Sequence, residues 1–160
     1  AQTGATLLMP LLREMGMPVA EVIRICSAVG NHDERSGCPV SEISAALIIA
    51  DKIDAHRARV RRTKYDFNDI HDRVNYSIRN TQVSIDSENR VIRFACKMDD
   101  SSSVKEFLNI YMSRMTLSEA ASQFLGCRFE FLVNGMLINN TPVRPAQPPV
   151  PPPTGQETVL

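Results

Sequence analysis

The hydrophobic period of this chain changes near Asn80, and that change constrains its fold more than any other feature. Before it, apolar residues recur every three or four positions, beginning with the stripe Leu7, Leu8, Leu11, Leu12 and Met15. After it, the segment TQVSIDSENRVIRFACKM alternates between polar and apolar residues on both sides of a turn at 86–89. A period near 3.6 is typical of amphipathic helices, and a period of two is typical of strands. The sequence therefore predicts an α+β protein that is all-helical over 1–80 and mixed over 81–140.

Two helices are predicted at the start of the chain. The first spans about 3–15 and stops at Gly16, because glycine favours helix ends. Pro18 suits the first turn of the second helix, which should end at Gly30. The residues expected on its inner face are Val19, Val22, Ile23 and Cys26. Because the apolar stripe of the first helix is already under way at the first residues, we expect the chain to begin inside a domain.

Two more helices are predicted before the period changes. Ser41 suits the N-cap of a third helix, which reads SEISAALIIADKIDAHRARVRR. It is apolar nearly all round from Ile43 to Ala50, as in a buried helix, and then becomes strongly basic. A fourth helix is expected over 67–78. Its inward residues should be Phe67, Ile70, Val74 and Ile78.

The second half of the chain reads as a small ββαββ module. The hairpin at 81–98 is followed by a helix that opens with Ser103 and Glu106, the spacing of a capping box, and closes at Gly126. A second hairpin follows, with its turn at Asn134-Gly135. Residues 141–160 contain seven prolines and are predicted to be a disordered tail. That tail suits either a passive extension or a ligand for a proline-binding domain.

Composition excludes several classes of protein. Eighteen basic and eighteen acidic residues give no net charge, so nothing biases the whole chain toward nucleic acid or membrane surfaces. No apolar run is long enough to span a bilayer, and no membrane partner is predicted. The four cysteines lack CxxC spacing, which favours reduced, buried thiols over a thiolate zinc site. These features predict a cytoplasmic protein.

The third predicted helix carries the residues that are best suited to bind a metal ion or a phosphate group. Asp51 follows the most apolar stretch of the chain, and Asp54 lies three residues later on the same predicted helix face. Beyond them lie His56 and a run of arginines from Arg57, which would suit phosphate groups. This order fits a metal-plus-phosphate site. Asp51 could equally form a salt bridge with a neighbouring helix, and the arginines could lie on a solvated face.

The segment NHDERSGCPVSEISAALIIADKID resembles part of the HD-domain metal-dependent phosphohydrolases. That family is named for a His-Asp doublet that binds a divalent metal. His32 falls on the family's later histidine and Asp51 on its final aspartate ligand, 19 positions apart. The opening AQTGATLL resembles the family's H-x-x-x-G-A-x-x-L helix. The resemblance covers 1–62, so the first part reads as a truncated helical HD-type core. A histidine directly before Ala1 and the doublet further upstream are then expected.

The resemblance implies a role for each site residue. His32 and Asp51 would ligate iron, manganese or magnesium, and Asp51 would also orient the attacking water. Arg57, about one and a half turns beyond Asp51 on the predicted helix, is chosen to neutralise the phosphate of the substrate. Asp54 would hold a histidine or arginine in place. The substrate would be a phosphorylated small molecule, with nucleotides among the candidates. Two protein ligands are too few for a catalytic metal, so the 160-residue chain is expected to be inactive by itself.

Other residues and other functions are weighed beside this reading. Asp33 and Glu34 are expected to be exposed loop acids, and His56 and His71 to be surface or packing histidines. A second hypothesis is a non-catalytic HD-like module that regulates, or that binds a nucleotide or protein. RNA binding through the basic run at 57–64 is weaker, because no aromatic residues are interleaved with basic ones on a strand.

Overall fold

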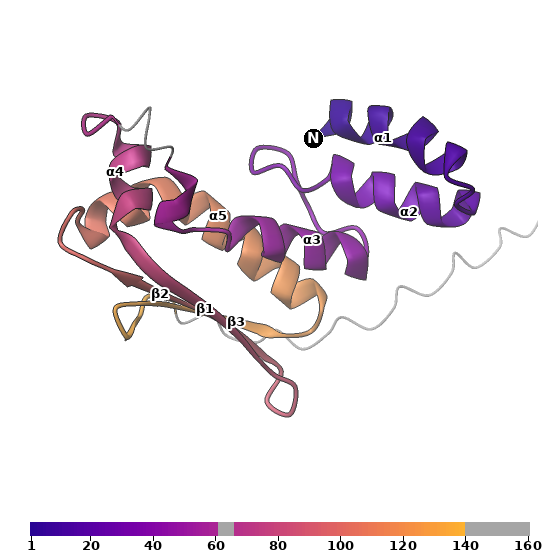
Figure 1. Ribbon diagram of the computed structural model, residues 1–160. Coiled ribbons are helices and arrows are strands. Elements are labelled where there is room, and N and C mark those ends of the chain that lie inside the picture. Colours follow the sequence, from indigo (N-terminus) through magenta and orange to yellow (C-terminus); the bar gives the residue numbers. More distant parts are fainter. Residues whose placement is uncertain (61–65, 140–160) are drawn as a thin grey trace, which may run out of the picture.

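The computed structural model describes residues 1–60 and 66–139. The predicted disordered tail at 141–160, and the basic residues Arg61, Arg62 and Lys64, lie outside the described residues. The described part is a mixed α+β fold (Figure 1). Its helices are α1 (Gln2–Glu14), α2 (Val19–Gly30), α3 (Glu42–Lys52), the 3-10 turn η1 (Arg57–Arg59), α4 (Ile70–Ser77) and α5 (Val104–Phe124). Its strands are β1 (Ile78–Asp86), β2 (Val91–Met98), β3 (Arg128–Val133) and β4 (Met136–Leu137).

The four strands form one sheet in the order β1-β2-β3-β4. The two predicted hairpins are confirmed, because β1 pairs antiparallel with β2 and β3 pairs antiparallel with β4. Between them β2 and β3 run parallel, with Phe94 beside Phe131, and α5 makes the crossover. A parallel pair requires such a long connection, so α5 is obliged to cross one face of the sheet.

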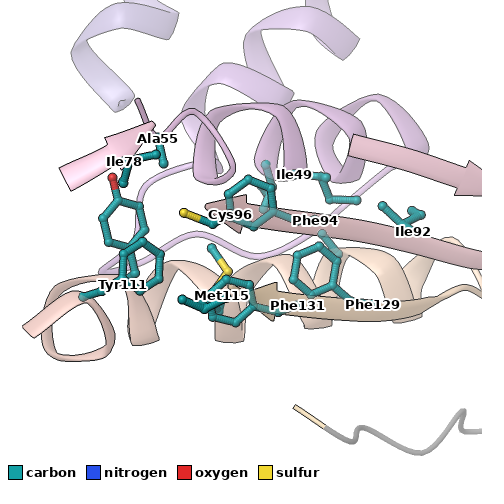
Figure 2. Close-up of a cluster of buried hydrophobic side chains, with 14 of the residues drawn as sticks. Ile49, Ala55, Ile78, Ile92, Phe94, Cys96, Tyr111, Met115, Phe129 and Phe131 are labelled. Carbon is teal, nitrogen blue, oxygen red and sulfur yellow. The ribbon is translucent and has the colours of Figure 1, made fainter. Parts of the chain in front are cut away.

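The core lies between that face of the sheet and the helices α3 and α5. Strands β2 and β3 alternate buried and more exposed residues, so every second side chain faces the helices. Figure 2 shows Phe94, Phe131 and Met115 pointing toward one another in this layer. The rings of Phe94 and Phe131 stack with centroids 5.7 Å apart, and Phe107 stacks on Phe131 at the same distance. The same core includes Ile48 of α3, so it joins residues on both sides of position 80.

Helices α1 and α2 form a further layer above α3 (Figure 1). Val22 and Cys26 of α2 are buried as predicted, together with Ala28. The prediction is wrong for Val19 and Ile23, which are exposed. The first helix buries none of its residues. The apolar side chains of this outer layer therefore contribute little to the main core.

Local chemistry fixes several element ends as predicted. Ser103 accepts from the Glu106 backbone, and the Glu106 side chain accepts from Ser102 and Ser103, which completes the capping box of α5. Asn134 and Gly135 both have positive φ, 50° and 84°, as a two-residue hairpin turn requires.

The third and fourth helices are shorter than predicted. Helix α3 ends at Lys52 instead of continuing through the basic residues, and the chain turns before η1. The His56 ring accepts from the Ala58 backbone and starts that turn, a local bond that competes with a continuing helix. Asp51 and Asp54 therefore do not share a helix face. Phe67 was expected inside but is 60% exposed, because α4 begins only at Ile70.

None of the helices in the described ranges is long and apolar enough to cross a membrane. All four cysteines lie within these ranges, and none forms a disulfide. Cys26 and Cys96 are buried as predicted, whereas Cys38 is exposed. Burial raises the pKa of the Cys96 thiol to about 12, so this side chain stays protonated in the core.

Candidate functional site

His32 lies in the loop between α2 and α3, in a conformation that fixes its tautomer. Its Nδ1 atom is 2.6 Å from the Val29 carbonyl oxygen. A carbonyl can only accept a hydrogen bond, so Nδ1 carries the proton and the neutral ring has its lone pair on Nε2. Gly37 allows the tight turn that follows, because a Cβ atom there would lie 2.2 Å from the Asp33 carbonyl oxygen.

Lys52 is the most unusual charged residue near His32. It ends α3 and is only 3% exposed, although lysine is rarely buried unless it is paired. Its ammonium lies 2.6 Å from Asp51 Oδ2 and 3.6 Å from Glu34 Oε1. It therefore joins the loop that carries His32 to the end of the helix that carries Asp51.

Glu34 extends this network to α5. Arg114 Nε lies 2.9 Å from Glu34 Oε1, and the Ser113 hydroxyl lies 3.3 Å from Glu34 Oε2. Glu34 was expected to be an exposed loop acid, and it is exposed, but its carboxylate also has two cationic partners. We call Glu34, Asp51, Lys52 and Arg114 the ion network.

Asp54 and Arg57 lie beyond the ion network. The Asp54 carboxylate and its backbone carbonyl both accept from Arg59 Nη1. Arg57 donates to the Tyr76 carbonyl oxygen at 2.9 Å, and its guanidinium lies over the Tyr76 ring, 4.2 Å from the centroid. Arg57 thus packs on α4, and Asp54 holds Arg59, a member of the predicted basic run, in place.

A polar cavity of about 90 Å³ opens beside the ion network. Its lining residues are Glu34, Arg59, His71, Asn75, Ile110, Tyr111 and Arg114. Burial raises the pKa of Tyr111 to about 12, so its hydroxyl stays protonated and donates to Asn75 Oδ1 at 2.8 Å. Two arginines in a small polar cavity suit an oxyanion such as a phosphate group. His71, expected to be a surface or packing residue, contributes to this lining.

The two residues implied as metal ligands have donor atoms that suit a divalent ion, but two donors are too few to hold a catalytic one. His32 offers Nε2, and the Asp51 carboxylate is exposed, a mixed nitrogen and oxygen set that suits iron or manganese. Within 1–60 and 66–139, however, no group of three or more His, Cys, Asp or Glu side chains could hold a metal. A catalytic ion would thus need donors from outside the described residues.

Lys52 and Arg114 were not singled out from the sequence, and Arg59 was included only as a member of the basic run that begins at Arg57. The expectation that α3 is buried on all sides is wrong, because Ile43 is 46% exposed and one stripe alone is buried. Lys52 follows Ile48 and Ile49 by four and three positions, so its helical spacing on this stripe gave one usable signal. Arg114 gave none, since its role depends on how α5 packs beside the loop of Glu34. Comparisons of the chain with family models, with curated proteins and with solved structures find no match.

Proposed function

We propose that this chain contributes the later part of a metal-dependent phosphohydrolase site, in which His32 and Asp51 are two of the metal donors. The observation that carries the proposal is the hydrogen bond from His32 Nδ1 to Val29, because a histidine that ligates a metal commonly donates its other ring nitrogen to a carbonyl or carboxylate. That bond sets the ring orientation and leaves Nε2 as the donor atom.

The ion network supports the proposal by linking the loop that carries His32 to the end of α3, where Asp51 lies. Lys52 holds Asp51 Oδ2 on one side and Glu34 on the other, and Glu34 lies two residues after His32. A positioned carboxylate binds a metal, or orients a water, with less loss of side-chain freedom than a mobile one.

In this proposal, three arginines bind the phosphate group of the substrate. Arg59 and Arg114 line the polar cavity beside Glu34, and Arg57 lies two residues before Arg59. A guanidinium carries five donors, so each of these side chains has more than its observed bonds use. A bound divalent metal would supply a water with a lowered pKa, and the arginines would neutralise the phosphate that this water attacks.

The test is hydrolysis of p-nitrophenyl phosphate and of nucleoside phosphates by the full-length gene product with Mn²⁺, Fe²⁺ or Mg²⁺. Asp51→Ala and His32→Ala should each abolish turnover while the helix content stays unchanged, because alanine is a good helix former. Asp100→Ala, which removes an exposed carboxylate in the turn before α5, is the matched control and should keep full activity. Full activity of Asp51→Ala would remove that residue from the mechanism. A folded protein that binds nucleotide without hydrolysing it would favour the non-catalytic regulatory alternative.

A further inference from the structure

Strand β1 leaves one side of the sheet without a neighbouring strand. It is the first strand in the order β1-β2-β3-β4, and within the described residues its only strand partner is β2 (Figure 1). At the opposite side β4 is only two residues long, whereas β1 has nine. Every residue of β1 from Gln82 to Asp86 is exposed. An edge strand presents backbone N–H and C=O groups that can pair with another strand.

The middle of β1 lacks the features that usually prevent such pairing. The segment NTQVSI, residues 80–85, contains no charged residue, no proline and no glycine. Natural proteins commonly protect an exposed edge with lysine, proline or a bulge. The irregularity of β1 lies between Ile78 and Asn80, before this segment begins. Within 1–60 and 66–139, a regular, neutral edge of six residues therefore remains open to strand addition.

Two apolar side chains on this edge are also left exposed by the described part of the chain. Val83 pairs with Phe94 and Ile85 with Ile92, so both face the helical side of the sheet. They are nevertheless 45% and 74% exposed, because no described helix extends over them. A strand added beside β1 would cover part of both side chains.

We propose that β1 is a self-association surface, on which β1 of a second copy of this chain pairs antiparallel and joins the two sheets. The proposal goes beyond the proposed enzymatic function and does not depend on it. With Val83 of one copy beside Val83 of the other, Ile85 lies beside Thr81 of the second copy on the same face. Gln82 then lies beside Ser84 on the opposite face, where the two polar side chains can form a hydrogen bond.

The charges of β1 agree with this register. Arg79 and Asp86 flank the neutral segment. In the proposed pairing Asp86 lies beside Asn80 of the second copy, and Arg79 lies beside Ser87, so no charged side chain meets one of like charge. Like charges directly opposite each other would destabilise the pair. The sequence of β1 is thus complementary to itself.

Sedimentation of the 160-residue protein and of its Val83→Lys variant tests the proposal. We expect the wild type to form a dimer, and Val83→Lys to weaken it by about tenfold or more, because two lysines would meet at the centre of the interface. Ile23→Lys, on the exposed face of α2, is the matched control and should leave the dimer unchanged. Circular dichroism should show that both variants keep the wild-type fold.

Disulfide cross-linking in a Cys38→Ser background tests the register. Val83→Cys should cross-link two copies, since directly opposite residues have Cα atoms about 4.5–5.5 Å apart. Ile85→Cys is more exposed but should not, because the two positions would lie about 13 Å apart along the strands. A protein that stays monomeric up to about 1 mM would overturn the proposal. So would a dimer that Ile23→Lys disrupts and Val83→Lys does not.

Discussion

Helices α1 and α5 carry apolar residues at the same helical spacing, yet they differ in what they bury. Phe107, Tyr111 and Met115 of α5 lie in the core against the sheet. In α1 no residue is buried, and Leu7 remains 65% exposed. Hydrophobic spacing predicts which face of a helix could be buried, but whether that face has a partner depends on the rest of the fold. The described structure therefore divides into a core of α3, α5 and the sheet, and an outer layer of α1 and α2.

Truncating one side chain in each part tests this division most strongly. Phe131→Ala should lower the free energy of unfolding by about 3–5 kcal/mol, because it opens a cavity beneath the stacked rings of Phe94 and Phe107. The matched change Leu11→Ala should alter it by no more than about 0.5 kcal/mol, because Leu11 is exposed on α1. Urea denaturation followed by circular dichroism measures both. Equal losses would show that α1 belongs to the core.

Removing the buried lysine should have the next largest effect. Lys52→Ala deletes a buried stem and leaves Asp51 and Glu34 without their shared cation. Both carboxylates retain some contact with water, so we expect a loss of about 2 kcal/mol, less than for a fully buried pair. Lys105→Ala on the exposed surface of α5 is the control, and its effect should stay within about 0.5 kcal/mol. A Lys52→Ala variant as stable as the wild type would show that the ion network does not hold the loop to α3.

The N-cap of α5 should contribute a smaller amount. Ser103→Ala removes the side-chain acceptor for the Glu106 backbone and should cost about 1 kcal/mol. Ser36→Ala, in the exposed loop before α3, should cost nothing measurable. The same denaturation experiment reports both values. If the two serines prove equivalent, the capping box does not stabilise the core helix.

Acid should weaken the contact between α4 and α5. The hydrogen bond from Arg73, aided by Ser102 and Ser103, lowers the pKa of Glu106 to about 2 from its ordinary value of 4.5. Because the folded-state pKa is depressed, this contribution is present above about pH 4.5 and is lost as the pH falls toward 2. Between about pH 5 and pH 3 the wild type should therefore lose more stability than Glu106→Gln. Parallel pH profiles of the two proteins would exclude this role for Glu106.

Much of the fold follows from short-range chemistry that the sequence displays. Ser103 with Glu106 marks a helix start, and Asn134-Gly135 marks a hairpin turn, because each needs only neighbouring residues. The end of α3 was not predicted, because no glycine or proline follows Lys52 to mark it. The helix ends there because His56 and Asp54 form local hydrogen bonds that compete with a continuing helix. The parallel pairing of β2 with β3 was not predicted either, because it depends on how α5 crosses the sheet.

In the candidate site too, local features were predicted from the sequence and long-range contacts were not. His32 and Asp51 were predicted from their order along the chain, and each is oriented by a local contact, with Val29 and with Lys52 respectively. The contacts that tie these two segments together through Glu34 come from different elements. Lys52 links Asp51 to Glu34, and Arg114 of α5 binds the same glutamate. Arg57, chosen from helical geometry that the structure does not have, instead packs on Tyr76. Partners brought together by tertiary packing leave no spacing signal in one sequence.

The most direct test of the proposed site is Mn²⁺ titration of the 160-residue protein, followed by nuclear magnetic resonance. Paramagnetic broadening detects weak binding, so it suits a site with only two described donors. We predict that the signals of His32 and Asp51 broaden first, and that His32→Ala and Asp51→Ala each remove this effect while His56→Ala does not. Broadening that is uniform over the protein, or that centres on His56 or His71, would contradict the assignment of His32 and Asp51 as metal donors.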